Sequence, residues 1–102
     1  LLNNLISNAI EAVAEAGSKS PVRISSEISS GEVIIAIEDK GTGIPESELE
    51  RIFEPRFTTK NHGLGLGLAM VKSIAEQASG RVWVKSKEGE GSTFYVSLPS
   101  GK

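Results

Sequence analysis

Residues 58–72, with the sequence TTKNHGLGLGLAMVK, guide the interpretation of the whole chain. Glycine alternates with leucine from Gly63 to Gly67, and an apolar run with helical spacing continues from Leu68 to Ala78. The pattern predicts a loop that becomes a helix at Leu68. Glycine costs a helix about 1 kcal/mol relative to alanine, so such a start favours a special role, for example backbone N–H groups that converge on an anion. A plain flexible turn is the alternative, and this stretch alone does not decide between them.

The composition limits the class of protein. The chain has 102 residues, of which 38% are hydrophobic and 24% charged, which suits one globular domain. Its net charge of −2 and its lack of a long basic cluster argue against nucleic acid as a partner. It has no cysteine, which excludes a disulfide framework and a thiol nucleophile and fits a reducing compartment. No apolar run is long enough to span a membrane and no secretory leader is visible, so we expect a soluble, cytoplasmic domain without direct membrane contact.

The first 16 residues predict a helix that Gly17 ends. Its apolar stripe consists of Leu2, Leu5, Ile6, Ala9, Ile10 and Val13. The opposite stripe consists of Asn4, Asn8, Glu11 and Glu15. Asparagine is a poor helix former, and its amide oxygen suits Mg²⁺ while its NH₂ group can donate to phosphate, so two stacked asparagines favour a ligand over simple solvation. The helix opens without an N-cap, and we expect the sequence to be an N-terminally truncated piece of a longer kinase.

Alternating apolar residues predict four strands, at 22–29, 32–38, 81–87 and 93–98. The run from Asp39 to Pro45 predicts a tight turn. A helix is expected over residues 46–53, and it is short because Pro55 ends it. This order of elements predicts an α/β (α+β) two-layer sandwich, with helices on one face of a mixed, mostly antiparallel sheet.

Common glycine motifs do not fit. The glycine spacing departs from the dinucleotide-binding fingerprint, and Gly67 is followed by Leu68 and not by the Lys-Ser/Thr pair of a P-loop. The signatures of protein kinases and of serine hydrolases are also absent from the sequence.

Five runs nevertheless occur in a fixed order. They are Asn4 with Leu5-Ile6-Ser7-Asn8-Ala9; Asp39-x-Gly41-x-Gly43-Ile44-Pro45; Ile52-Phe53-Glu54-Pro55 with Phe57-Thr58-Thr59-Lys60; Gly63-x-Gly65-Leu66-Gly67-Leu68; and Gly89-x-Gly91-Ser92-Thr93-Phe94. Together they resemble the N, G1, F, G2 and last glycine-rich boxes of the catalytic ATP-binding domain of sensor histidine kinases, in the GHKL superfamily. The resemblance implies the Bergerat-type fold, here without the first strand and helix usual in the family. The phrase Phe-Thr-Thr-Lys resembles the nitrogen-regulation and oxygen-sensing branch.

The resemblance implies a role for each box. Asn8 would coordinate Mg²⁺ with Asn4 beside it, and Glu11, where many members carry a lysine, would bind the metal directly or through water. Asp39 would accept a hydrogen bond from the adenine amino group. The residues implied around the base are Gly41, Gly43, Ile44 and Thr93. Those implied around the phosphates are Lys60, Gly63, Leu64, Gly65, Leu66, Gly67 and Leu68. Phe53 and Phe57 would anchor an ATP lid, with Arg56 in a position that is usually aromatic, and we expect the lid to be disordered or displaced without nucleotide.

The function implied is binding of Mg·ATP and, in the parent protein, transfer of the γ-phosphoryl group to a histidine on a separate dimerisation domain, with a response regulator as the later partner. His62 is interpreted as a solvated loop residue and not as the acceptor, so the isolated chain should not phosphorylate itself. One alternative is a GHKL-type ATPase, which the amide of Asn4, in place of a general-base glutamate, argues against. The other is a nucleotide-sensing or interaction module without catalysis.

Overall fold

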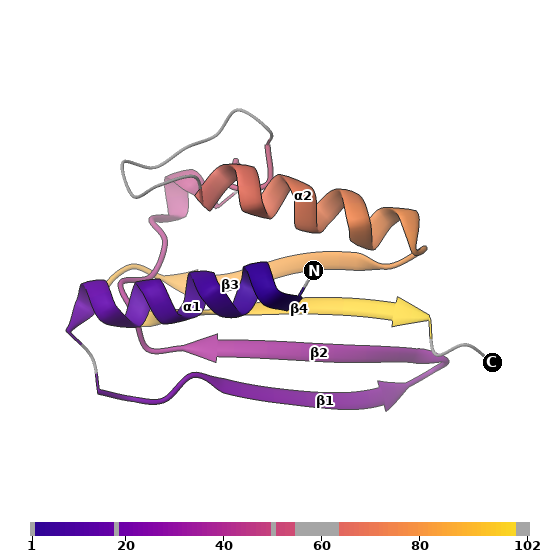
Figure 1. Ribbon diagram of the computed structural model, residues 1–102, viewed down its shortest axis with the longest axis horizontal. Helices are drawn as coiled ribbons and strands as arrows, with labels where there is room; N and C mark the ends of the chain where they lie inside the picture. Colours follow the sequence, from indigo (N-terminus) through magenta and orange to yellow (C-terminus); the bar gives the residue numbers. More distant parts are fainter. Residues whose placement is uncertain (1, 18, 50, 55–63, 100–102) are drawn as a thin grey trace.

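The computed structural model describes residues 2–17, 19–49, 51–54 and 64–99. Two helices cover one face of a four-stranded sheet (Figure 1). The elements are α1 (Leu2–Ala16), β1 (Arg23–Ser29), β2 (Glu32–Asp39), the short 3₁₀ helix η1 (Glu46–Glu48), α2 (Leu64–Gln77), β3 (Arg81–Lys87) and β4 (Gly91–Pro99). The predicted two-layer sandwich is confirmed. No described helix is both long enough and apolar enough to cross a membrane.

The sheet has the order β1-β2-β4-β3, and its three strand pairs are all antiparallel. The prediction of a mixed, mostly antiparallel sheet is confirmed, and every strand pair among the described residues is antiparallel. The pair β2 and β4 lies at the centre, with Ile37 opposite Phe94 and Asp39 opposite Ser92. Because side chains alternate between the two faces of a strand, this register places Ile37 and Phe94 under the helices and Thr93 on the other face.

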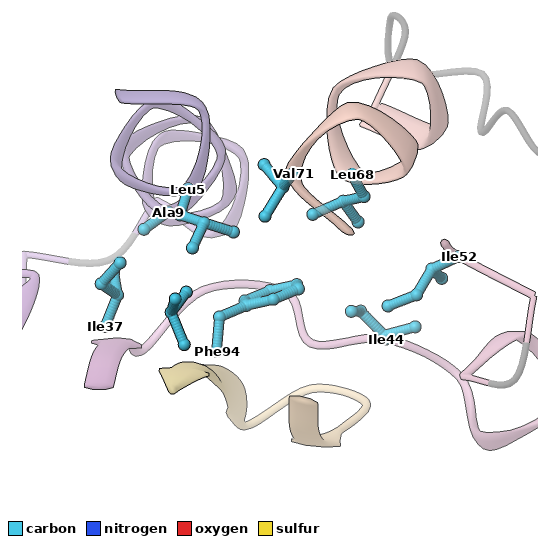
Figure 2. Close-up of a cluster of buried hydrophobic side chains, with 9 residues drawn as sticks. Leu5, Ala9, Ile37, Ile44, Ile52, Leu68, Val71 and Phe94 are labelled. Carbon is cyan, nitrogen blue, oxygen red and sulfur yellow. The ribbon is translucent and has the colours of Figure 1, made fainter. Parts of the chain in front are cut away.

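The core lies between the helices and the central strands (Figure 2). Its fully or nearly buried members are Leu5, Ala9, Ile37, Ile44, Ile52, Leu68, Val71, Phe94 and Val96. The i, i+4 spacing of Leu5 and Ala9 brings both onto the face of α1 that meets the sheet. Burial of a side chain such as Leu5, which is 0% exposed, contributes about 1.5–3 kcal/mol. Phe53 packs against the core through an edge-to-face contact with Phe94, with ring centroids 6.4 Å apart.

Among the described side chains of the predicted apolar stripe of α1, Ile10 is the exception. Ile10 is 56% exposed, because it lies next to Ala9 around the helix and points away from the centre of the sheet. Two isoleucines of the edge strand β1 are also exposed, Ile24 at 56% and Ile28 at 76%, although they lie on the same face of the sheet as the helices. All seven residues of β1 are exposed, since α1 packs over β2 and β4 and leaves this edge open.

Two helix predictions need correction. The helix expected to begin at Leu68 begins at Leu64, so Gly65 and Gly67 are helical. Glycine is less costly in this first turn than in a helix interior, because the first four N–H groups have no partner within the helix anyway. The short helix expected over residues 46–53 is only the 3₁₀ helix η1 followed by turns, and the backbone there is held by bonds three residues apart, such as Arg51 N–H to Glu48 O at 2.9 Å.

Candidate functional site

The candidate site begins at Asp39, the last residue of the central strand β2. Its side chain is only 3% exposed, although carboxylates are almost never buried without partners. The backbone N–H of Gly41 donates to Asp39 Oδ1 at 2.9 Å, and the backbone N–H of Ser92 also bonds the carboxylate. An ionised carboxylate can only accept hydrogen bonds. Its remaining acceptor positions therefore suit a ligand that donates, such as an exocyclic amino group.

The electrostatics of Asp39 reflect this burial. Desolvation raises the pKa of the Asp39 carboxyl above its ordinary value of 3.8. The N–H groups of Gly41 and Ser92 oppose this rise in pKa by stabilising the charged form, and the negative charge of Glu38 adds to the rise. Desolvation is the larger effect, so burying this carboxylate in its charged form lowers the stability of the folded state. A buried carboxyl with a perturbed pKa is typical of a functional site.

The turn after Asp39 packs closely against α1. A Cβ atom at Gly41 would lie 2.6 Å from the backbone carbonyl carbon of Ala12, so only glycine fits between the turn and the helix. Asn8 and Asn4 precede Ala12 by one and two helical turns on the same face of α1. The backbone therefore brings the two asparagine positions toward the face of α1 that meets the Asp39 turn, while their side chains lie outside the described part of the structure. Glu11, beside Ala12, is exposed.

The same turn packs against the hairpin formed by β3 and β4. Gly43 has a φ of +73°, and a Cβ there would lie 2.2 Å from the Lys87 carbonyl oxygen. Gly91 has a φ of +124°, and its Cβ would lie 2.2 Å from the carbonyl oxygen of Asp39. Ile44 is buried in the core, and its N–H donates to the Ser86 hydroxyl at 2.8 Å. Residues 39–45 and 86–92 thus form one tightly packed unit around the carboxylate.

Two residues of β4 lie near the site, on opposite faces of the sheet, and only one of them was predicted. Thr93 lies opposite Glu38 and Lys85 on the face away from the helices, where it lines an open hollow of about 320 Å³. Ser92, 7% exposed and paired with Asp39, lies closer to the carboxylate and was missed from the sequence. The alternation of Phe94, Val96 and Leu98 could have identified it, because Ser92 belongs to the same face as these residues.

The start of α2 supplies the candidate phosphate end of the site. Leu64, Gly65, Leu66 and Gly67 form the first turn of this helix, whose N–H groups have no acceptor within it. These groups, together with the positive end of the helix dipole, suit an anion. Figure 1 shows the start of α2 at the same end of the sandwich as the end of β2 and the start of β4. Lys60, Gly63, Phe57, Arg56 and His62 lie outside the described residues, as does most of the predicted lid.

The oxygen ligands around the site suit a Mg²⁺ ion that is held partly by the protein and partly by phosphates and water. Within residues 2–17, 19–49, 51–54 and 64–99, no group of three or more His, Asp and Glu side chains could enclose a metal ion. Mg²⁺ commonly keeps waters and binds one or two protein oxygens together with substrate phosphates. The helix α1 offers an amide at Asn8 and a carboxylate at Glu11, which would suit that mode.

Comparison with known proteins agrees with this arrangement. A family model described as histidine kinase-, DNA gyrase B-, and HSP90-like ATPase matches residues 1–102. The sensor histidine kinase ZraS of Escherichia coli K12 is 44% identical over 99 residues, which cover 97% of this chain and 21% of ZraS. The sensor histidine kinase TmoS of Ectopseudomonas mendocina is 39% identical over 102 residues, covering 97% of this chain and 10% of TmoS.

A solved structure shares the fold. The catalytic domain of histidine kinase ThkA, in a nucleotide-free form, superposes with a TM-score of 0.81 at 38% identity and covers 97% of this chain. The matched region is 63% of that ThkA chain. The sequence therefore spans about a fifth or less of the length of ZraS and TmoS, and less than two thirds of the solved ThkA domain.

Proposed function

This chain belongs to the histidine kinase-, DNA gyrase B-, and HSP90-like ATPase family, as the ATPase domain found in sensor histidine kinases, and we propose that it binds Mg·ATP and donates the γ-phosphoryl group to a histidine. The acceptor histidine is expected on a dimerisation domain of the parent protein, on the same or the partner subunit. A response regulator then takes the phosphoryl group from that histidine. The proposed location of the domain is the cytoplasm.

The observation that carries ATP binding is the buried carboxylate of Asp39. Its side chain is 3% exposed and is held by the N–H of Gly41, and glycines without room for a Cβ surround it. Adenine offers an N–H₂ donor to such an acceptor, whereas guanine offers an oxygen at the same position. We therefore assign adenine recognition to Asp39, with the backbone of Gly41, Gly43 and Ile44 around the base.

The phosphates are assigned to the N-terminal turn of α2, with Lys60 and Gly63 preceding it and Leu68 closing it. Mg²⁺ is assigned to Asn8, with Asn4 one turn away and Glu11 close by. The ion, when bound, neutralises phosphate charge, and the amides hold it without adding a general base. Thr93, on the outer face, remains a prediction for the adenine side. The narrower resemblance to nitrogen-regulation and oxygen-sensing kinases rests on residues 57–60 and also remains a prediction.

Transfer is favoured over hydrolysis by the chemistry of Asn4. An amide has no basic lone pair that can take a proton from water at neutral pH, so Asn4 cannot serve as the general base of an ATPase. The chain then supplies positioning and charge neutralisation, and the acceptor histidine supplies the nucleophile. Steady release of inorganic phosphate from ATP by the chain alone would favour the ATPase alternative.

Titration calorimetry tests the proposal directly. ATP should bind the 102-residue chain in Mg²⁺, and the affinity should fall when the metal is chelated. Asn8→Ala should weaken Mg·ATP binding and leave the affinity for metal-free ATP unchanged, with Ser7→Ala, an exposed neighbour in α1, as the matched control. An Asn8→Ala variant that binds Mg·ATP as tightly as the wild type would contradict the metal assignment, and no ATP binding by the wild type would contradict the proposed function.

We also propose that additional chain covers the open edge of the sheet in the parent protein. Ile24 and Ile28 are both more than half exposed and lie on the helix side of β1, and Ile10 of α1 is also 56% exposed. Among the residues that the structure describes, no strand pairs with the outer edge of β1, and proteins usually cover or protect such an edge. A preceding strand and helix, as the family resemblance implies, would satisfy both requirements.

A further inference from the structure

The hydroxyl of Ser86, in β3, joins the Asp39 turn to the β3–β4 hairpin. It accepts the N–H of Ile44 at 2.8 Å, across 42 residues of sequence, and donates to the carbonyl oxygen of Gly91 at 2.9 Å. It also lies 2.7 Å from the hydroxyl oxygen of Ser92. A half-buried serine with three partners is unusual, because most side-chain hydrogen bonds of serine are single and local.

The number of hydrogens fixes the direction of each bond. Ser86 has one hydroxyl hydrogen, which the carbonyl oxygen of Gly91 takes because a carbonyl cannot donate. The hydrogen between the two serines must then come from Ser92. Ser86 thus accepts twice and donates once, and the hydrogen of Ser92 points toward Ser86. The oxygen of Ser92 is left with acceptor capacity only, beside an Asp39 carboxylate that also only accepts.

We propose that Ser86 is a positioning residue for adenine recognition, which holds the Asp39 turn in place through Ile44 and sets the hydrogen-bonding direction of Ser92. The inference rests on the proposed ATP binding at Asp39. Two acceptors side by side favour the amino group of adenine and repel the O6 oxygen of guanine. Without the Ser86 hydroxyl, the hydrogen of Ser92 becomes free to rotate and donate, and the site loses part of this discrimination.

The close contacts around Ser86 explain why one hydroxyl has this influence. Gly91 and Gly43 bring the two backbones within van der Waals contact, so the separation of the strands is fixed. The N–H of Gly89 adds a 2.7 Å bond to the carbonyl oxygen of Thr42 at the tip of the hairpin. The Ser86 side chain is bonded to both segments, to Ile44 of the Asp39 turn and to Gly91 of the hairpin.

The test is Ser86→Ala in the 102-residue chain, with ATP and GTP affinities from competition against a fluorescent nucleotide. We expect ATP affinity to fall about tenfold, as for the loss of one buried hydrogen bond, and the preference for ATP over GTP to fall with it. Ser86→Thr keeps the hydroxyl and should restore the preference. Ser26→Ala, at an exposed serine of β1, is the matched control and should change neither quantity.

A purely structural role for Ser86 would lower the melting temperature and leave the ATP-to-GTP ratio unchanged, and that result would overturn the inference. Should Ser86→Ala fail to fold, Ser86→Cys fills the same volume with a much weaker donor and acceptor, and the same fall in the ratio is expected. Amide exchange at Ile44 should be protected in the wild type and faster in these variants. ATP binding by the wild type with an unchanged ratio in the variants overturns this inference alone, whereas no ATP binding by the wild type overturns the proposed function and this inference with it.

Discussion

The substitution Asp39→Asn should weaken ATP binding and, at neutral pH, raise the stability of the fold. The asparagine oxygen can keep the hydrogen bond from Gly41, which leaves its NH₂ group facing the adenine amino group, a donor against a donor. A hydrogen bond to a charged group contributes about 1.5–3 kcal/mol, so ATP affinity should fall roughly 10- to 150-fold. The same NH₂ group suits the oxygen of guanine, so the ATP-to-GTP preference should fall further than ATP affinity alone. Calorimetry with both nucleotides in Mg²⁺ measures the two effects.

Stability should change in the opposite direction. Burial raises the pKa of the Asp39 carboxyl above 3.8, so the folded state holds this proton more tightly than the unfolded state does. The stability that Asp39 contributes is therefore fully present below its ordinary pKa and is lost as pH rises through the raised folded pKa. Asparagine carries no charge to desolvate. The melting temperature of Asp39→Asn minus that of the wild type should thus increase as pH rises from about 3 and become constant above the folded pKa.

Glu38→Gln is the control for removing one carboxylate beside the site. Glu38 is a partly exposed neighbour that pairs with Lys40 at 3.7 Å, and its loss should leave nucleotide preference intact. Two results would refute the reasoning on Asp39. One is an ATP-to-GTP preference in Asp39→Asn equal to that of the wild type. The other is a difference in melting temperature that decreases as pH rises, because that sign requires a folded pKa below the ordinary value.

Three further perturbations test the site and its surroundings. In chemical denaturation, Gly91→Ala should destabilise the chain by about 3 kcal/mol or more, because a φ of +124° is strained for alanine and the Cβ would meet the Asp39 carbonyl oxygen at 2.2 Å. Gly89→Ala is the control: its φ is +84° and the space around it is open, so it should cost only about 1–2 kcal/mol. Incubation with γ-labelled ATP should leave the isolated chain unlabelled, and label at His62 would show that this residue is an acceptor after all. Ile28→Thr should change the melting temperature of this chain little and lower that of a longer parent protein, whereas equal effects in the two would argue against a covering segment at β1.

The sheet was predictable because its signals are local. Apolar alternation gave β3 at residues 81–87 as the structure has it, and the other strands within one or two residues at each end. The turn Ser79-Gly80 was also predictable as the end of α2, and the N–H of Gly80 does bond the Ala75 carbonyl oxygen at 2.7 Å. The start of α2 was not, because helix propensity argues against glycine in a helix while the position of these glycines in the first turn lowers that cost.

The site was only partly predictable, since its two halves meet through tertiary contacts. The burial of Asp39, which is 3% exposed, is understandable from its place at the end of an apolar strand. The bond between Ile44 and Ser86 joins residues 42 positions apart, and no local pattern distinguishes Ser86 from the other serines of the chain. The exposure of Ile24 and Ile28 was equally hidden, because alternation shows which face of a strand is apolar and not whether a helix covers it.

The position of Asp39 explains why the surrounding backbone is so tightly constrained. A carboxylate with a raised pKa costs stability at neutral pH, and a turn free to move would let it reach water and lose its directed acceptor. Gly41 against α1, Gly43 against the hairpin and Gly91 against Asp39 itself prevent that movement, because each contact leaves no room for a side chain. Recognition of a base by a fixed acceptor then costs little further ordering on binding. We therefore expect Asp39 and the tightly packed glycines around it to determine which nucleotide binds. The start of α2 is expected to determine how the γ-phosphoryl group of that nucleotide is presented.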